Sequence, residues 1–140
     1  MMNQSLRLAA VDAEDLAVIA TCLQDALVLV GDMAYLPKDH RFVLVANRFL
    51  WESKAEDGSY ARTNAGLVFD KVARVQRRNV DLGKQDTILS LLTIQQQPGM
   101  IELTFAGDAS IRLETAEIQC RLEDLDEPWP TNWKPKHKLD

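Results

Sequence analysis

The stretch FVLVANRFLW, residues 42–51, is the longest strand candidate in the chain and decides the fold class. Read with a period of two, its odd-numbered side chains share one face: Val43, Val45, Asn47, Phe49 and Trp51. The even-numbered side chains share the other face: Phe42, Leu44, Ala46, Arg48 and Leu50. Both faces are largely apolar at the start, which predicts a strand that is central in a sheet or curled around a core.

Short strands are predicted on both sides of this stretch. Apolar runs alternate with turn signals from residue 27 to residue 113, and the turns fall at Gly31-Asp32, residues 37–40, Pro98-Gly99 and Gly107-Asp108. The polar segment 52–64 is predicted to be a long loop. Upstream, residues 5–10 read as a strand. A helix follows from an N-cap at Asp12, with one apolar stripe at Leu16, Ile19, Ala20 and Leu23.

A second helix is predicted over residues 116–125. Thr115 is the expected cap, the apolar seam is Ile118, Leu122 and Leu125, and Pro128 ends the segment. Six acidic residues against Arg121 give residues 114–127 a net charge of −5. The sequence therefore predicts an acidic amphipathic helix that closes the run of strands.

These elements together predict an α+β fold. The expected architecture is a strongly bent antiparallel sheet, or a partly open barrel, of six to seven strands with a C-terminal amphipathic helix and an additional N-terminal strand and helix. This element order resembles a pleckstrin-homology-like barrel. A two-layer α+β sandwich and a split barrel are the alternatives. We expect one globular domain over residues 1–128 and an extended arm over residues 129–140.

Composition favours an ordinary soluble domain. The chain has 140 residues, 46% hydrophobic and 26% charged, with a net charge of −5. This acidic balance argues against bulk electrostatic binding to nucleic acid or to an anionic membrane. The start lacks the pattern of a secretory signal, and no apolar run could span a bilayer. We expect a cytoplasmic protein whose two thiols, Cys22 and Cys120, are buried and reduced; whether they pair in a disulfide is left open.

The chain offers little catalytic chemistry. His40 and His137 lack metal-ligand spacing to other ligands, and neither a Walker-type loop nor a GxGxxG motif is present. Cys22 paired with a histidine is the one conceivable nucleophilic dyad, and its apolar setting favours burial. Two acid pairs, Asp12 with Asp15 and Glu123 with Asp124, could act as acid and base only if one carboxyl were desolvated. We therefore expect no cofactor, no metal and no enzyme activity.

A local basic patch is the first candidate binding feature. Lys71, Arg74, Arg77, Arg78 and Lys84 against Asp81 give a net charge of +4. Such a patch could bind a phosphate, a nucleic-acid backbone or an acidic peptide. It could equally be a solvated strand edge, where charges deter edge pairing, or it could meet the acidic C-terminal segment of another copy.

The aromatic arm is the second candidate binding feature. Trp129 and Trp133 flank Pro130 in a segment without periodicity. These side chains either fold back over the sheet or anchor a partner, because Trp is enriched at interaction hot spots.

Long stretches resemble a proteobacterial family catalogued only as a domain of unknown function. The resemblance is carried by LRLAAVDAEDLAVIATCLQDALVLVGDMAYLPKDHRFVLVANRFLWE (6–52), GLVFDKVARVQ (66–76), LSLLTI (89–94), LTFAGDASIRLE (103–114) and CRLEDLDEPWPT (120–131). It implies a bacterial, cytosolic, stand-alone domain and assigns no functional residue.

Three functions remain open. The leading hypothesis is a non-catalytic binding or assembly domain that acts on a protein or peptide partner, with a homodimer as one form. The second is a nucleic-acid-associated accessory protein that uses Arg74, Arg77 and Arg78. The third is a small enzyme with carboxylate acid/base chemistry.

Overall fold

The computed structural model describes residues 6–54, 60–125 and 129–130. These residues form one α-helix, one short 3-10 helix and ten strands, in chain order β1 Arg7–Ala10, α1 Ala13–Cys22, β2 Leu27–Leu36, η1 Pro37–Asp39, β3 Arg41–Lys54, β4 Tyr60–Phe69, β5 Arg74–Arg78, β6 Ile88–Gln97, β7 Met100–Phe105, β8 Ala109–Glu114, β9 Cys120–Asp124 and β10 Trp129–Pro130.

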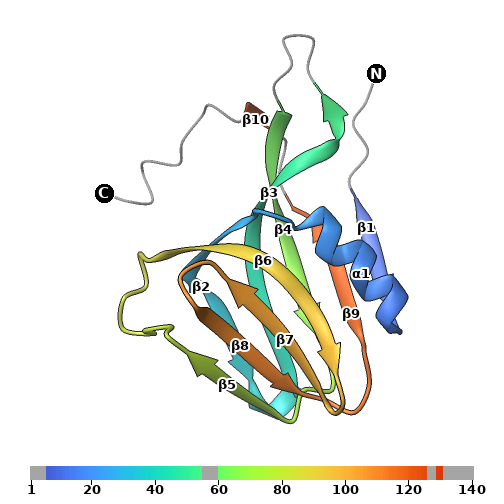
Figure 1. Ribbon diagram of the computed structural model, residues 1–140, viewed down its shortest axis with the longest axis vertical. Coiled ribbons are helices and arrows are strands. Elements are labelled where there is room, and N and C mark those ends of the chain that lie inside the picture. Colours follow the sequence, from blue (N-terminus) through green and yellow to red (C-terminus); the bar gives the residue numbers. More distant parts are fainter. Residues whose placement is uncertain (1–5, 55–59, 126–128, 131–140) are drawn as a thin grey trace.

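Nine of the described strands follow one another in a single antiparallel sheet that does not close into a barrel. The order is β1-β9-β4-β3-β2-β6-β7-β8-β5, and β10 pairs with β4 off this path. Strands β2 and β6 pair only over residues 27–29 and 88–90. Each strand has a register shift beside this short paired segment, between Val28 and Met33 in β2 and between Leu91 and Thr93 in β6. In Figure 1 the strands β6, β7 and β8 lie in front of β2, β3 and β4, so the sheet doubles over itself.

The hydrophobic core lies between these two layers. Inner-face residues of β3 and β4, such as Leu44 and Leu67, are at most 1% exposed, as is Leu103 of β7. The prediction that residues 42–51 form a central strand is confirmed, because β3 has β2 on one side and β4 on the other. The outer face of β3 stays half-buried, from Val43 to Phe49.

Helix α1 begins where the sequence predicted. The Asp12 carboxylate accepts a hydrogen bond from the backbone N–H of Asp15 at 2.8 Å, which satisfies a free donor of the first turn. The predicted stripe is confirmed at Leu16, Ile19 and Leu23, which are all fully buried. The helix covers the core beside β1 and β6 (Figure 1).

The predicted C-terminal helix is wrong. Residues 120–124 form β9, which pairs with β1 on one side and β4 on the other. The physical reason is an alternation with period two: Cys120 and Leu122 are buried, while Arg121 and Glu123 are exposed. Leu125, expected on the helical seam, is instead 55% exposed. The predicted cap Thr115 makes a local turn, in which its hydroxyl donates to the carbonyl of Glu117.

The predicted fold class is therefore wrong in two respects. Among the described residues the strand path has nine members instead of six to seven, and residues 116–125 hold strand β9 instead of the predicted closing helix, so the comparison with a pleckstrin-homology-like barrel fails. Two turn or loop predictions also fail. Gly31-Asp32 lies within β2, at its bulge, and the segment predicted as a loop over 52–64 contains the end of β3 and the start of β4.

The predicted arm over residues 129–140 is described only at its start. Trp129 and Pro130 form β10, and the backbone register aligns Trp129 with Arg62 and Pro130 with Ala61. Residues 131–140, including Trp133 and His137, lie outside the described residues. In the part of the chain that the structure describes, no helix is long and apolar enough to cross a membrane.

Candidate functional site

The predicted basic patch is spread over the end strand β5, the turn before it, which holds Lys71, and the loop after it, which holds the exposed Lys84. The Arg74 guanidinium lies 3.5 Å from the Glu114 carboxylate, and that of Arg78 lies 3.1 Å from the Asp108 carboxylate. Arg77 donates to the carbonyl of Val80 at 3.1 Å. Lys71 is exposed and left-handed, with φ 63°. The structure thus places the three arginines on one exposed end strand, with two of them beside carboxylates, and the two lysines in the segments that flank it.

Of the two predicted acid pairs, the fold keeps Asp12 beside Asp15 in the capping turn of α1 and separates Glu123 from Asp124. Asp12 caps α1 and Asp15 occupies its first turn. Glu123 faces solvent and pairs with Arg7 at 3.2 Å, whereas Asp124 is 6% exposed and pairs with Arg48. Neighbouring strand residues point to opposite faces, so Glu123 and Asp124 do not share a site.

Cys22 and His40 lie beyond opposite ends of β2, and His137 is outside the described residues. His40 ends η1 in a left-handed conformation, with φ 51°. Cys22 is half-buried and Cys120 is buried, and the two do not form a disulfide. Burial raises the pKa of the Cys120 thiol to about 12. Among residues 6–54, 60–125 and 129–130, no cluster of His, Cys, Asp and Glu side chains could hold a metal ion.

A cluster of different residues lies on the outer face of β3 and β4. Cross-strand register places Asn47 opposite Asn64 and Phe49 opposite Arg62, and such pairs share a face of the sheet. We call Asn47, Phe49, Trp51, Arg62 and Asn64 the outer-face cluster. The rings of Phe49 and Trp51 are 4.9 Å apart between centroids and tilted by 45°.

Arg62 is held by this cluster at two points. Its guanidinium carbon lies 4.0 Å from the centroid of the Phe49 ring, a cation–π contact. Its Nε donates to the side-chain oxygen of Asn47, and a terminal nitrogen donates to the backbone carbonyl of Asn47 at 3.1 Å. Asn47 in turn donates to the side-chain oxygen of Asn64 at 3.1 Å. The chain of contacts fixes the plane of the guanidinium.

The electrostatic setting of Arg62 differs from that of the exposed arginines. The side chain is half-buried, and this desolvation lowers the pKa of its guanidinium, partly offset by the negative charge of Asp25. An arginine remains charged under all ordinary conditions. The outer face therefore carries a partly desolvated positive charge.

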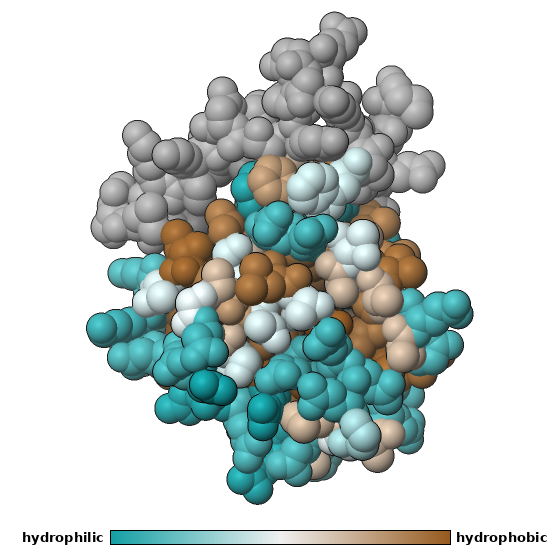
Figure 2. Space-filling view, in the orientation of Figure 1, coloured by the Kyte–Doolittle hydropathy of each residue, from teal (hydrophilic) through white to brown (hydrophobic). Residues whose placement is uncertain are grey.

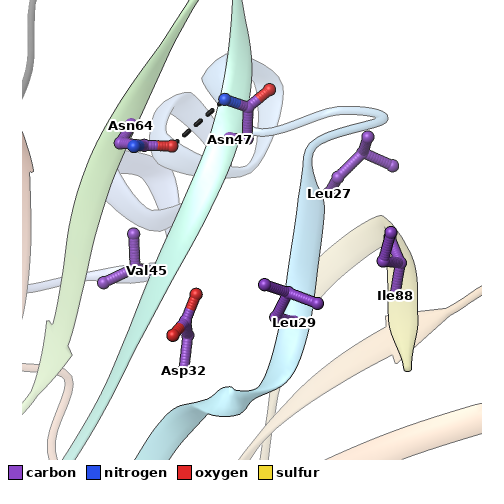
Figure 3. A pocket seen from close by; sticks show the side chains of 7 residues that line it. All are labelled: Leu27, Leu29, Asp32, Val45, Asn47, Asn64 and Ile88. Carbon is purple, nitrogen blue, oxygen red and sulfur yellow. Dashed lines mark hydrogen bonds between the residues drawn. The ribbon is translucent and has the colours of Figure 1, made fainter. Parts of the chain in front are cut away.

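A shallow apolar pocket adjoins the cluster. Asn47 and Asn64 line one side of it, and Leu27, Leu29, Val45 and Ile88 supply most of the rest, with Asp32 at its margin (Figure 3). Its cavity volume is about 40 Å³. This space is far below the roughly 300–1,000 Å³ of a typical small-molecule site. The pocket fits a small side chain better than a cofactor.

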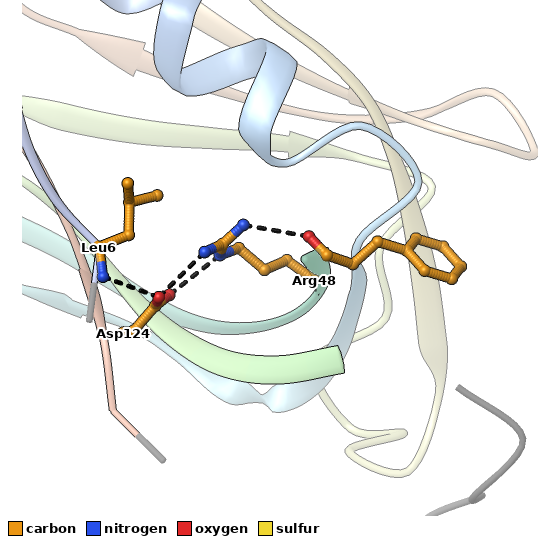
Figure 4. Close-up of polar contacts among 4 residues, drawn as sticks. Leu6, Arg48 and Asp124 are labelled. Carbon is orange, nitrogen blue, oxygen red and sulfur yellow. Dashed lines mark hydrogen bonds and ion pairs between the residues drawn. The ribbon is translucent and has the colours of Figure 1, made fainter. Parts of the chain in front are cut away.

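A buried ion pair supports β3 from its inner face. Arg48 is fully buried, and its guanidinium makes two 2.9 Å bonds to the two carboxylate oxygens of Asp124 (Figure 4). Arg48 also donates to the carbonyl of Phe49 at 3.0 Å, and Asp124 accepts the backbone N–H of Leu6 at 2.9 Å. This bidentate pair ties the middle of the sheet to its β9 and β1 end.

Apolar groups on the opposite layer are more scattered. Figure 2 shows the face that bears β6, β7 and β8, where brown apolar groups near the centre are interrupted by white and teal ones. Leu92 of β6 is 48% exposed. Single exposed apolar side chains are normal on a soluble protein. The outer-face cluster is the more specific candidate because its side chains contact one another.

Sequence reasoning found three of the five members of the outer-face cluster. The alternation in residues 42–51 already placed Asn47, Phe49 and Trp51 on one face. Arg62 and Asn64 were missed because they fall in a polar segment predicted to be a loop. The signal that could have found them is the alternation of β4, in which Thr63, Ala65 and Leu67 are buried.

The chain belongs to a family of proteins of unknown function. The model of the family described as "Protein of unknown function (DUF2948)" matches residues 6–137, nearly the whole chain. The resemblance predicted from the sequence is thereby confirmed at the level of the family, while its proteobacterial origin stays a prediction. No curated protein and no solved structure matches the chain.

Proposed function

We propose that this protein is a non-catalytic binding domain that engages a protein or peptide partner through the outer-face cluster. The observation that carries the proposal is the contact of three side chains: Trp51, which is 40% exposed, lies against Phe49, and Phe49 lies against Arg62. Trp and Arg are the residue types that dominate binding energy at protein interfaces.

The position of the cluster on a sheet favours binding over catalysis. Its members stand on adjacent strands, β3 and β4, whose inner faces are packed into the core. A rigid support lowers the conformational entropy lost when a partner binds. The adjoining pocket of about 40 Å³ is suited to one small apolar side chain of a partner. The arrangement supports recognition of a polypeptide surface.

The basic patch gives weaker support to nucleic-acid binding. Arg74 and Arg78 each have a carboxylate partner of their own, which offsets part of the positive charge that a phosphate would meet. We place the binding activity in the cytoplasm, in line with the composition of the chain. Self-association would be one form of the proposal, in which a second copy covers the same face.

Selection from a random peptide library displayed on phage tests the proposal. We expect the wild-type protein to enrich peptides whose binding is lost with Trp51→Ala. Leu82→Ala is the matched control, because Leu82 is a similarly exposed apolar side chain outside the cluster, 50% exposed. The proposal is wrong if no peptide is enriched, or if the enriched peptides bind Trp51→Ala as well as they bind wild type.

A further inference from the structure

Arg62 differs from most of the other arginines because no carboxylate oxygen of the described residues lies within 4 Å of its guanidinium. Seven of the nine arginines have a carboxylate oxygen within 4 Å: Arg7, Arg41, Arg48, Arg74, Arg78, Arg112 and Arg121. Among the described residues Arg62 and Arg77 have none, and Arg77 is exposed. Among the described residues, Arg62 is thus the one half-buried arginine that has no carboxylate oxygen within 4 Å of its guanidinium.

The hydrogen bonds of Arg62 leave donors unused. Both of its bonds go to Asn47, to the side-chain oxygen and to the backbone carbonyl, and these are uncharged acceptors. A guanidinium carries further N–H groups in a fork that matches a carboxylate. A partly buried charge is costly without an ionic partner. An anionic group that accepted hydrogen bonds from the unused N–H groups of Arg62 would therefore stabilise the charge of its guanidinium.

The neighbours of Arg62 restrict how such a group can approach. Phe49 covers one side of the guanidinium, and Asn47 fixes its rotation through two contacts. Trp51 adds an exposed aromatic surface next to Phe49, and the apolar pocket begins at Asn47. A carboxylate bound here would have aromatic and aliphatic surface beside it, which suits an acidic side chain within an apolar segment of a polypeptide.

We propose that the outer-face cluster recognises an aspartate or glutamate side chain of a partner protein, and that Arg62 binds its carboxylate. This inference rests on the proposed function, and it names the chemistry that the partner presents. The argument is charge complementarity: an oriented, half-buried cation, which no carboxylate of the described residues approaches within 4 Å, meets a partner that supplies one. An aliphatic residue near the acid would fill the pocket lined by Leu27, Leu29 and Val45.

The test repeats the phage selection with two arginine variants. We expect the peptides that depend on Trp51 to carry Asp or Glu at one position above its frequency in the starting library. With Arg62→Gln this preference disappears. With Arg112→Gln it remains, because Arg112 is an exposed arginine that pairs with Glu102 elsewhere on the sheet.

A second arm changes the peptide instead of the protein and measures its binding to wild type and to Arg62→Gln. In the tightest selected peptide, synthesised with blocked ends, the acid is changed to its amide, Glu→Gln or Asp→Asn. We expect binding to wild type to weaken about tenfold or more, as when one member of a desolvated charge pair is removed. The same peptide change has little effect on binding to Arg62→Gln, provided that Arg62→Gln keeps the wild-type circular dichroism spectrum.

The outcomes separate the inference from the proposed function. Peptides that depend on Trp51 but show no acidic preference, or whose preference survives Arg62→Gln, overturn the inference and leave the proposed function standing. An amide peptide that binds wild type as tightly as the acid also overturns the inference. If no peptide depends on Trp51, both are wrong.

Discussion

Loss of one member of the buried pair Arg48–Asp124 is expected to destabilise the fold strongly. The two side chains are 0% and 6% exposed, and both guanidinium–carboxylate bonds are 2.9 Å long. Asp124→Asn keeps the shape but removes the charge, so the Arg48 cation stays buried without compensation. Removing one partner of a buried pair costs about 3–5 kcal/mol. Arg48→Met is expected to cost a similar amount, because it strands the Asp124 carboxylate.

The double variant Arg48→Met/Asp124→Leu removes both charges and so distinguishes the net energy of the ion pair from the cost of leaving one charge buried alone. Replacing a whole buried ion pair with apolar groups is often close to neutral. Here the backbone N–H of Leu6 loses its acceptor, Asp124, and an unsatisfied buried donor costs about 1–3 kcal/mol. We therefore expect the double variant to be destabilised by about 1–3 kcal/mol, less than either single variant.

Equilibrium unfolding in urea at pH 7 measures these differences. The four proteins form a double-mutant cycle, and equal slopes of the unfolding free energy against urea confirm that the same transition is compared. Single variants within about 1 kcal/mol of wild type, or a double variant whose loss equals the sum of the single losses, would refute the reasoning.

Three further predictions concern stability. Gly31→Ala is expected to destabilise the fold by about 1 kcal/mol in urea unfolding, because the new Cβ would lie 3.0 Å from the Gln85 Cβ, a crowding that outweighs the lower chain entropy of Ala. Asp12→Ala is expected to cost about 1 kcal/mol, since the Asp15 N–H loses its cap. Burial raises the pKa of the Cys120 thiol from 9.0 to about 12, so the folded state holds this proton more tightly than the unfolded chain does. The contribution of the buried thiol to the free energy of unfolding is therefore complete below pH 9 and is lost as the pH rises toward 12. Unfolding free energies at several pH values should therefore fall more steeply above pH 9 for wild type than for Cys120→Ala.

Each of these predictions has a contrary result. A Gly31→Ala protein as stable as wild type would show that the loop at Gln85 yields without cost. An Asp12→Ala protein with unchanged stability would show that water replaces the cap. Parallel pH profiles for wild type and Cys120→Ala would show that the thiol titrates alike in the folded and unfolded chains.

Local periodicity predicted the elements whose pattern has one interpretation. Residues 42–51 form a mostly apolar run with several β-branched and aromatic residues, and the stripe Leu16, Ile19 and Leu23 has only helical spacing. The segment that became β9 has two interpretations. Ile118 and Leu122 are four apart, which fits one face of a helix and also one face of a strand that includes Cys120. The sheet decides between them, because β9 fills the position between β4 and β1.

The candidate site could be predicted only in part, because it depends on pairing between strands. The β3 members follow from alternation, but Arg62 joins them only through the register that sets it opposite Phe49. The polarity of residues 52–64 favoured a loop, since the outer face of β4 is itself polar at Arg62 and Asn64. The Arg48–Asp124 pair spans 76 positions in the chain, a distance at which no local pattern connects two residues.

Nuclear magnetic resonance of the side chains tests the central claim most directly. The uniformly ¹⁵N-labelled protein is titrated with the tightest selected acidic peptide, while the Nε–H signals of arginine and the indole N–H signal of Trp51 are followed. The account predicts saturable shifts at Arg62 and Trp51, with no shift at Arg112. Shifts confined to Arg74, Arg77 and Arg78 on β5, with Arg62 and Trp51 unchanged, would contradict it.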